Sequence, residues 1–199
     1  HDPIGTLDQD SPAPRFDYEL RMDIDVDARP DIIRWSKPPL EVAVTVGGKA
    51  LRLIGVHAKS KAPHGAQNRD EAMRFSIANR RKQLAQAIWL RARIAGHLDA
   101  GTPLMVMGDM NDGPGLDEFE NLFGRSSVEI VLGQGGPAPL FDPHAKQALS
   151  RNLAAMPTTA RFWIRPEKRF LQALLDYIMV TPDFTERNAN WRIWHPLDD

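Results

Sequence analysis

Leu104-Met-Val-Met-Gly-Asp-Met-Asn-Asp-Gly-Pro-Gly115 is the stretch from which the predicted architecture is built. Four apolar residues follow Pro103, and the chain then enters a run of turn-forming residues that starts at Gly108. A short apolar run bounded by turn residues is typical of a buried strand. The stretch therefore predicts a central strand that delivers polar side chains to one end of a sheet.

Asp109 and Asn111 are the polar side chains that this strand delivers. Two residues apart on an extended chain, they can point to the same side. Gly108 before them permits an unusual backbone angle or a close approach by a ligand. A carboxylate suits a hard cation, and a carboxamide can donate a hydrogen bond to a phosphoryl oxygen. The pair is thus a candidate for metal and phosphate chemistry.

Ordinary turn chemistry is the alternative, because Asn, Asp and Gly all favour tight turns. A calcium-binding loop fits less well. Counted from Asp109, Gly113 occupies a position that needs Asp or Asn, and Pro114 occupies the position of the sharp-turn glycine. The choice between a turn and a catalytic element depends on the rest of the chain.

The composition is typical of a soluble globular protein, and we expect one domain over residues 1–199. The chain is 42% hydrophobic and 26% charged, with a formal net charge of -1, which argues against strong nonspecific attraction to nucleic acid. It has no cysteine, so a metal would be held by Asp, Glu, Asn or His. No apolar run reaches the roughly twenty residues of a membrane span. No signal peptide is visible, which favours a cytoplasmic location.

Alternation and turn residues predict the other strands. Residues 1–15 are expected to form a flexible arm, and the strict alternation from Phe16 to Val26 predicts a half-buried strand. Leu40–Val46 and Ala50–Val56 flank Gly47-Gly48, which predicts a hairpin. A short helix is expected at residues 117–123, and further strands are expected at residues 128–132, 161–165, 174–180 and 191–194.

One long helix is predicted over residues 70–98, capped by Asp70 and followed by Gly101. The run Arg80-Arg81-Lys82 spreads around this helix and is expected to be mostly solvated surface. Helix, hairpin and strands together predict an α/β layered domain dominated by sheet. The residues expected on the apolar stripe of the helix are Met73, Ile77, Leu84, Ile88 and Leu98.

His57 and Asp176 are two further candidates. His57 lies where the second strand of the hairpin gives way to a loop, although a histidine at such a place is more often surface or core. Asp176 interrupts an apolar strand, and a carboxylate there is costly unless it is paired or binds a metal. A buried salt bridge is the alternative explanation for Asp176.

Three motifs now stand in order along the chain: Val56-His57-Ala58-Lys59-Ser60, Gly108-Asp109-Met110-Asn111 and Leu175-Asp176-Tyr177-Ile178. They resemble the endonuclease/exonuclease/phosphatase superfamily, which includes DNase I-like nucleases, inositol polyphosphate 5-phosphatases and neutral sphingomyelinases. Gly-Asp-x-Asn is the most specific of the three motifs. The resemblance implies a four-layered α/β sandwich, in which two sheets pack face to face and the active site lies at one end of the sheets.

The resemblance also implies a role for each matching residue. Asp109 would orient or deprotonate the attacking water, and Asn111 would hold that water and a phosphoryl oxygen. His57 would hydrogen-bond the scissile phosphate and stabilise the charge that grows in the transition state. Asp176 would orient a further histidine. We expect Mg²⁺ as cofactor, with Mn²⁺ as the alternative and Asp109 as a metal ligand; Lys59 and Arg165 are the expected substrate-binding residues.

The sequence departs from the family pattern at both ends. Nothing before His57 matches the strand ending in Asn or the metal-binding Glu of the family, and His195-Pro-Leu-Asp-Asp199 does not match its Ser-Asp-His turn. We therefore expect an incomplete sandwich, either the C-terminal two thirds of a longer domain or a diverged member. A piece without those ligands is expected to bind metal weakly.

Three functions of different classes remain open at this point. The leading hypothesis is a metal-dependent phosphoesterase, a nuclease or phosphatase, that acts on a phosphodiester or a phosphomonoester. The alternatives are a noncatalytic module that binds a phosphorylated ligand or a protein, and a sandwich whose Asp and Asn only build a turn. Nucleic acid is one candidate substrate, beside an inositol phosphate or a lipid head group, because basic residues flank Phe162-Trp163; they are Arg161, Arg165, Lys168 and Arg169.

Overall fold

A four-stranded mixed sheet forms the centre of the computed structural model, which describes residues 15–23, 30–114, 124–150, 156–164, 168–187 and 189–194. β3 and β4 pair as an antiparallel hairpin, β4 and β5 are parallel, and β8 is antiparallel to β5. Because β4 and β5 run the same way, their carboxyl ends meet at one edge of the sheet. The strands, in spatial order, are β3 (Leu40–Val46), β4 (Lys49–His57), β5 (Leu104–Asp109) and β8 (Asp176–Val180).

The hairpin and the long helix follow the predicted pattern. Gly47 and Gly48 have φ of 56° and 77°, a left-handed turn that glycine adopts without strain and that joins two twisted strands. α1 (Arg69–Asp99) connects β4 to β5. Its N-cap is Asn68, whose side chain accepts a hydrogen bond from the Glu71 N–H, so the predicted capping by Asp70 is wrong by two residues.

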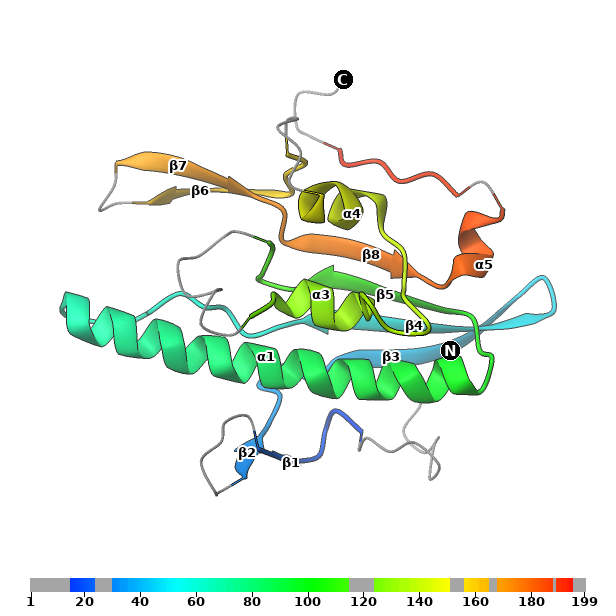
Figure 1. Ribbon diagram of the computed structural model, residues 1–199, viewed down its shortest axis with the longest axis horizontal. Helices are drawn as coiled ribbons and strands as arrows, with labels where there is room; N and C mark the ends of the chain where they lie inside the picture. The colour runs from blue at the N-terminus through cyan, green and yellow to red at the C-terminus, as the bar shows by residue number, and fades with distance from the viewer. Residues whose placement is uncertain are drawn as a thin grey trace.

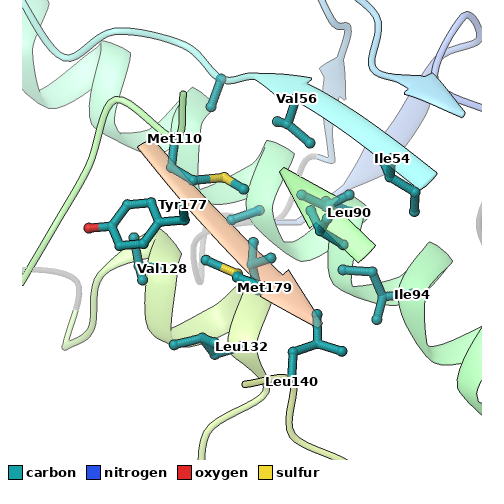
Figure 2. Close-up of a cluster of buried hydrophobic side chains, with 14 of the residues drawn as sticks. Ile54, Val56, Leu90, Ile94, Met110, Val128, Leu132, Leu140, Tyr177 and Met179 are labelled. Carbon is teal, nitrogen blue, oxygen red and sulfur yellow. The ribbon is translucent and has the colours of Figure 1, made fainter. Parts of the chain in front are cut away.

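α1 and α3 (Ser127–Leu132) cover one face of the sheet (Figure 1). A continuous hydrophobic core lies between the two layers. Ile54 and Val56 of β4 and Met179 of β8 face Leu90 and Ile94 of α1 in this core (Figure 2). The buried side of α1 differs from the predicted stripe, since Met73 and Ile88 are exposed. Polar residues, among them Arg80, Gln83 and Arg93, take part of that buried side.

The opposite face of the sheet is apolar as well. The pairing register places one set of side chains on it, and apart from the buried Val180 none of them is fully buried by the described residues. A face of this composition is typical of the interface between two layers. Within the described residues, one main sheet with α1 and α3 on one face agrees with the predicted α/β layered domain. The set is Leu40, Val42, Val44, Leu51, Leu53, Met105, Met107, Ile178 and Val180.

Two small antiparallel sheets and two short helices complete the described chain. β6 lies within one residue of the strand predicted at 161–165, whereas β7 was not predicted. None of the helices in the described ranges is long and apolar enough to cross a bilayer. The elements are β1 (Leu20–Met22) with β2 (Asp31–Ile33), β6 (Ala160–Ile164) with β7 (Arg169–Ala173), α4 (Pro143–Leu149) and α5 (Pro182–Thr185).

Three strand predictions are wrong over the described residues. The alternating segment from Phe16 forms a strand only at Leu20–Met22, because Phe16 lies in a turn and packs edge-on against Trp35 at 5.8 Å between ring centroids. Residues 128–132 belong to α3, which a capping box of Ser126 and Glu129 starts. Residues 191–194 form no strand. The helix predicted at 117–123 lies outside the described residues.

Candidate active site

His57, Asp109 and Asp176 lie in a row across three neighbouring strands. The parallel register of β4 and β5 sets His57 opposite Asp109, and the antiparallel register of β5 and β8 sets Asp109 opposite Asp176. The Nε2 atom of His57 is 3.8 Å from Oδ2 of Asp109. Three residues that are far apart in the sequence thus meet at the edge where β4 and β5 end.

Gly108 allows β5 to lie this close to β4. Its φ is 129°, and a Cβ atom at this position would lie 2.1 Å from the carbonyl oxygen of Val56. Only glycine can adopt this conformation at this separation. The prediction of an unusual backbone angle at Gly108 is confirmed.

Asn111 holds the Asp109 carboxylate from two directions. Its backbone N–H donates to Oδ1 of Asp109 at 2.7 Å, and its side-chain Nδ2 donates to Oδ2 at 3.1 Å and to the Ala58 carbonyl at 3.0 Å. Asn111 itself has a φ of 49°, a left-handed conformation that Asn tolerates better than most residues. The residues that form this turn are therefore also residues of the candidate site.

The surroundings of Asp109 change its acidity. Burial raises the pKa of the Asp109 carboxyl above its usual value, and the negative charge of Asp176 raises it further. The Asn111 N–H and the nearby His57 and Lys37 act in the opposite direction without cancelling the rise. A carboxylate with a raised pKa is a better proton acceptor.

Lys37 is a site residue that the sequence reasoning missed. Its Nζ atom lies 3.2 Å from Nδ1 and 3.3 Å from Nε2 of His57. Lys37 comes from the segment between β2 and β3, and no motif in the sequence marks it. It places a positive charge beside the row, where an anionic phosphate would be attracted.

Asp176 is exposed, so the prediction of a carboxylate buried within an apolar strand is wrong. It is the first residue of β8, and its backbone N–H and that of Leu175 each donate to Oγ1 of Thr159 at 3.0 Å. Asp176 lines a pocket of about 460 Å³ together with His144, Trp191 and Trp194. Among the described residues, His144 is thus a candidate for the histidine that Asp176 is expected to orient. His195 lies outside the described residues.

A buried ionic cluster follows the site residues directly in the sequence, and we name it the Asp112 cluster: Asp112, Lys61, Arg80 and Ser127. Oδ1 of Asp112 accepts hydrogen bonds from Lys61 Nζ at 2.7 Å and Arg80 Nη1 at 2.6 Å. Oδ2 accepts from the backbone N–H and the hydroxyl of Ser127 at 2.7 and 2.5 Å. Although burial opposes ionisation, the charges of Lys61 and Arg80 outweigh it and lower the pKa of Asp112.

The Asp112 cluster corrects two expectations. Arg80 was expected on a solvated surface, but its side chain is 1% exposed, because the partner that neutralises it lies 32 positions away. Asp112 was treated as a turn residue. A charged residue in a run of charges gives no sequence signal of such a distant partner.

Gln83 of α1 joins the two segments that carry the site residues. Its Nε2 atom donates to the carbonyl oxygens of Lys59 at 2.9 Å, Met110 at 3.2 Å and Asn111 at 2.9 Å. Because Lys59 follows His57 and Met110 follows Asp109, one buried amide fixes both strand ends against α1. Gln83 positions the site without belonging to the row.

One of the two predicted substrate-binding residues, Lys59, lies apart from the row. Lys59 lines a separate hollow with Arg34, Arg81 and Gln86, between α1 and the segment after β2. The other residue, Arg165, lies outside the described residues.

Whether the site suits a divalent metal depends on the donor side chains that the structure brings together. The described ranges contain no group of three or more His, Asp or Glu that could hold a metal ion. Asp109 and Asp176 nevertheless stand opposite each other, and the charge of Asp176 raises the pKa of Asp109. Mg²⁺ commonly binds through one or two carboxylates, with water and substrate phosphate as its other ligands. The pair fits a cation of this kind.

Comparisons with known proteins identify the family. A solved structure titled "Crystal structure of beta toxin 275-280 from Staphylococcus aureus" is 15% identical, covering 73% of this chain and 43% of that chain at a TM-score of 0.37. The chain therefore spans less than half the length of that protein. No curated protein sequence matches. A family model matches residues 15–198, which confirms the resemblance and the expected DNase I-like α/β fold: the chain belongs to the Endonuclease/Exonuclease/phosphatase family.

Proposed function

We propose that the row of His57, Asp109 and Asp176 hydrolyses a phosphate ester by in-line attack of water, with Mg²⁺ or Mn²⁺ as cofactor. Membership of the family supports a hydrolase of the phosphoesterase type. The observation that carries the proposal is the register that aligns the three side chains on β4, β5 and β8 while Asn111 holds the central carboxylate.

Asp109 would accept the proton of the attacking water. Both oxygens of its carboxylate have fixed directions, because the backbone and the side chain of Asn111 each donate to one of them. In the chain without a bound cation, burial raises the pKa of this carboxyl, which favours proton acceptance. The side-chain amide of Asn111 is used by Asp109 and Ala58, so in this geometry Asn111 orients the base.

His57 and Lys37 would contact the phosphate. The imidazole lies beside Asp109 at the strand end, and the Lys37 ammonium lies next to both ring nitrogens. Donors that are already in place where charge develops stabilise a transition state without costly rearrangement. Lys37 would add attraction for the anion in the ground state as well.

Asp109 and Asp176 are the residues that would hold the cation. When bound, the cation would neutralise negative charge on the phosphate and on the leaving oxygen. The residues fit this function without an additional ligand from the described chain.

Hydrolysis of bis-p-nitrophenyl phosphate and of p-nitrophenyl phosphate, with Mg²⁺ and with EDTA, tests the proposal. We expect hydrolysis that requires the metal and falls roughly 100-fold or more in Asp109→Asn, because a general base contributes that much to the rate. Asp99→Asn, which changes an exposed carboxylate at the end of α1, should behave like the unmodified chain.

Two results would count against this function. Activity of Asp109→Asn within a few-fold of the unmodified chain would show that Asp109 is not the base. Phosphate binding that survives EDTA, with no turnover of either ester, would favour a noncatalytic phosphate-binding module on the same fold. The preference between diester and monoester would begin to separate a nuclease from a phosphatase.

A further inference from the structure

The β6–β7 hairpin carries an unusual amount of exposed aromatic surface. Phe162 is 43% exposed, Trp163 is 49% exposed and Phe170 is 52% exposed. Aromatic side chains usually contribute to a core or an interface because burial of their large apolar area is favourable. Their exposure on a hairpin points to a partner.

One face of the hairpin forms a continuous strip of a cation and two rings. Trp163 pairs with Phe170 across the strands, with ring centroids 5.0 Å apart at an angle of 66°. The guanidinium of Arg161 lies over the Phe170 ring at 4.1 Å. Phe162 projects from the other face, opposite Leu171. Planar aromatic surface is therefore available on both sides of the hairpin.

The charge of the hairpin has one dominant sign. Residues 160–173 contain four basic side chains, Arg161, Arg165, Lys168 and Arg169, and one acidic side chain, Glu167. Arg161 and Lys168 are exposed, and they lie near opposite ends of the aromatic strip. Positive charge beside exposed rings is complementary to an anionic ligand that also has flat apolar parts.

The hairpin begins at the candidate active site. Thr159 directly precedes β6, its N–H donates to the Ala173 carbonyl at the end of β7, and its hydroxyl accepts from the Asp176 N–H. Figure 1 shows the hairpin projecting past the end of β8 at which Asp176 lies. A chain molecule lying along the hairpin would thus lead toward the row of site residues.

We infer that the β6–β7 hairpin is a docking arm for single-stranded nucleic acid. Bases would stack on Trp163 and Phe162, and phosphates would contact Arg161 and Lys168, the combination by which single strands are bound without sequence preference. The inference rests on the proposed function, because it names a polynucleotide as the substrate of the same site.

The same residues fit a duplex and a membrane less well. The bases of a duplex are already stacked, so their faces are not available to the rings. A hairpin that enters a bilayer needs apolar side chains around its aromatic residues, whereas Arg161 and Lys168 are charged and exposed here, and charged side chains are costly in hydrocarbon.

Fluorescence anisotropy with a labelled oligothymidylate tests the inference. The measurement is made on the full chain in EDTA, so that it does not depend on turnover. We expect Trp163→Leu to weaken binding roughly 10-fold, the effect of losing one stacked base, while Leu keeps apolar bulk in the hairpin. Phe75→Leu, which changes an exposed aromatic residue on α1, is the matched control. Arg161→Gln should lower the slope of log Kd against log salt by about 1.

The outcomes separate this inference from the proposed function. Hydrolysis of bis-p-nitrophenyl phosphate should be unchanged in Trp163→Leu, since a small ester does not reach the arm. Turnover of the small ester without oligonucleotide binding would overturn the docking arm and leave the proposed function standing. Oligonucleotide binding that depends on Trp163, with no turnover of any ester, would support the arm and refute the proposed function.

Three further results would overturn the inference. Equal weakening by Trp163→Leu and Phe75→Leu would show that the loss is not specific to the hairpin. Equal affinity for single-stranded and duplex oligonucleotides would show that stacking does not contribute. Binding through Trp163 to vesicles of phosphatidylserine and phosphatidylcholine, without oligonucleotide binding, would assign the hairpin to a membrane surface.

Discussion

α1 neutralises two buried carboxylates at two places along its length. In the Asp112 cluster, Arg80 and Lys61 face Asp112. In the second cluster, which we name the Glu41 cluster (Glu41, Arg52, Arg93 and His97), Arg93 and His97 of α1 donate to Glu41 of β3 at 2.6 and 2.7 Å. Arg80 and Arg93 stand about 20 Å apart along the helix axis.

The two clusters have the same chemistry but different neighbours. Asp112 directly follows Asn111 and binds the first residue of α3, so it fixes the segment that orients Asp109. Glu41 lies on the edge strand β3, and its contacts join that strand to α1 without involving a residue of the row. The comparison indicates that one cluster positions the site, whereas the other only stabilises the fold.

Asp112→Ala should have the largest effect. Arg80 and Lys61 would keep their charges in a buried position without the carboxylate, and breaking a buried ion pair in this way costs about 3–5 kcal/mol. We expect that loss in urea unfolding, together with a drop in kcat of the folded protein of roughly 10-fold or more, because small displacements of catalytic groups are costly. Full activity in the folded fraction would remove the distinction between the clusters.

Glu41→Gln is the matched change in the other cluster. It removes the negative charge that Arg93 and His97 face, and we expect a loss of about 3 kcal/mol in the free energy of unfolding. Below the unfolding transition, kcat and KM for bis-p-nitrophenyl phosphate should be those of the unmodified chain. A large fall in kcat without unfolding would contradict a purely structural role.

Gln83→Ala sharpens the comparison with a smaller and more local change. It leaves the carbonyl groups of Lys59, Met110 and Asn111 without the amide donor, which costs about 1–3 kcal/mol. We expect kcat to fall roughly 10-fold as the two strand ends lose their common anchor. The control is Thr181→Val, which removes a buried hydroxyl that binds the backbone of Leu104 at the other end of β5. It should lower stability and leave kcat unchanged.

The pH dependence of stability should show the smallest difference between the Asp112 cluster and the Glu41 cluster. The folded-state pKa values of Asp112 and Glu41 are both lowered, so each carboxylate stabilises the fold above its ordinary pKa of 3.8 or 4.5. This contribution is lost as the pH falls through the lower folded-state value. Asp112→Asn and Glu41→Gln should each flatten the decline of unfolding free energy below about pH 4. A decline as steep as that of the unmodified chain would show that the carboxylate is not the titrating group.

The charge of Asp109 affects the pH dependence of stability in the opposite direction. The pKa of Asp109 is raised in the folded state, so its ionised form at neutral pH opposes folding. This cost shrinks as the pH falls below the raised value and is gone below the ordinary pKa of 3.8. Asp109→Asn should therefore raise the melting temperature in EDTA at pH 7 while it lowers activity. Catalytic groups commonly reduce stability in this way.

Local features of the sequence were sufficient for much of the sheet and the long helix. The β3–β4 hairpin, β5, α1 and β6 follow from glycine turns, short apolar runs and a helical stretch, which are properties of neighbouring residues. The short segment 128–132 was misassigned because periodicity does not separate a short buried strand from a short helix, and the capping box of Ser126 and Glu129 was the signal that would have identified α3.

By itself, the sequence determined the family motifs and the ends of β4 and β5, so His57, Asp109 and Asn111 could be named, because each lies where an apolar strand meets a turn. Only the tertiary structure decided which groups surround them. Lys37 reaches His57 from another segment, Arg80 is buried against Asp112, and Gln83 binds both strand ends. These contacts join residues far apart in the chain, and the charge of a side chain does not reveal whether water or a distant partner will neutralise it.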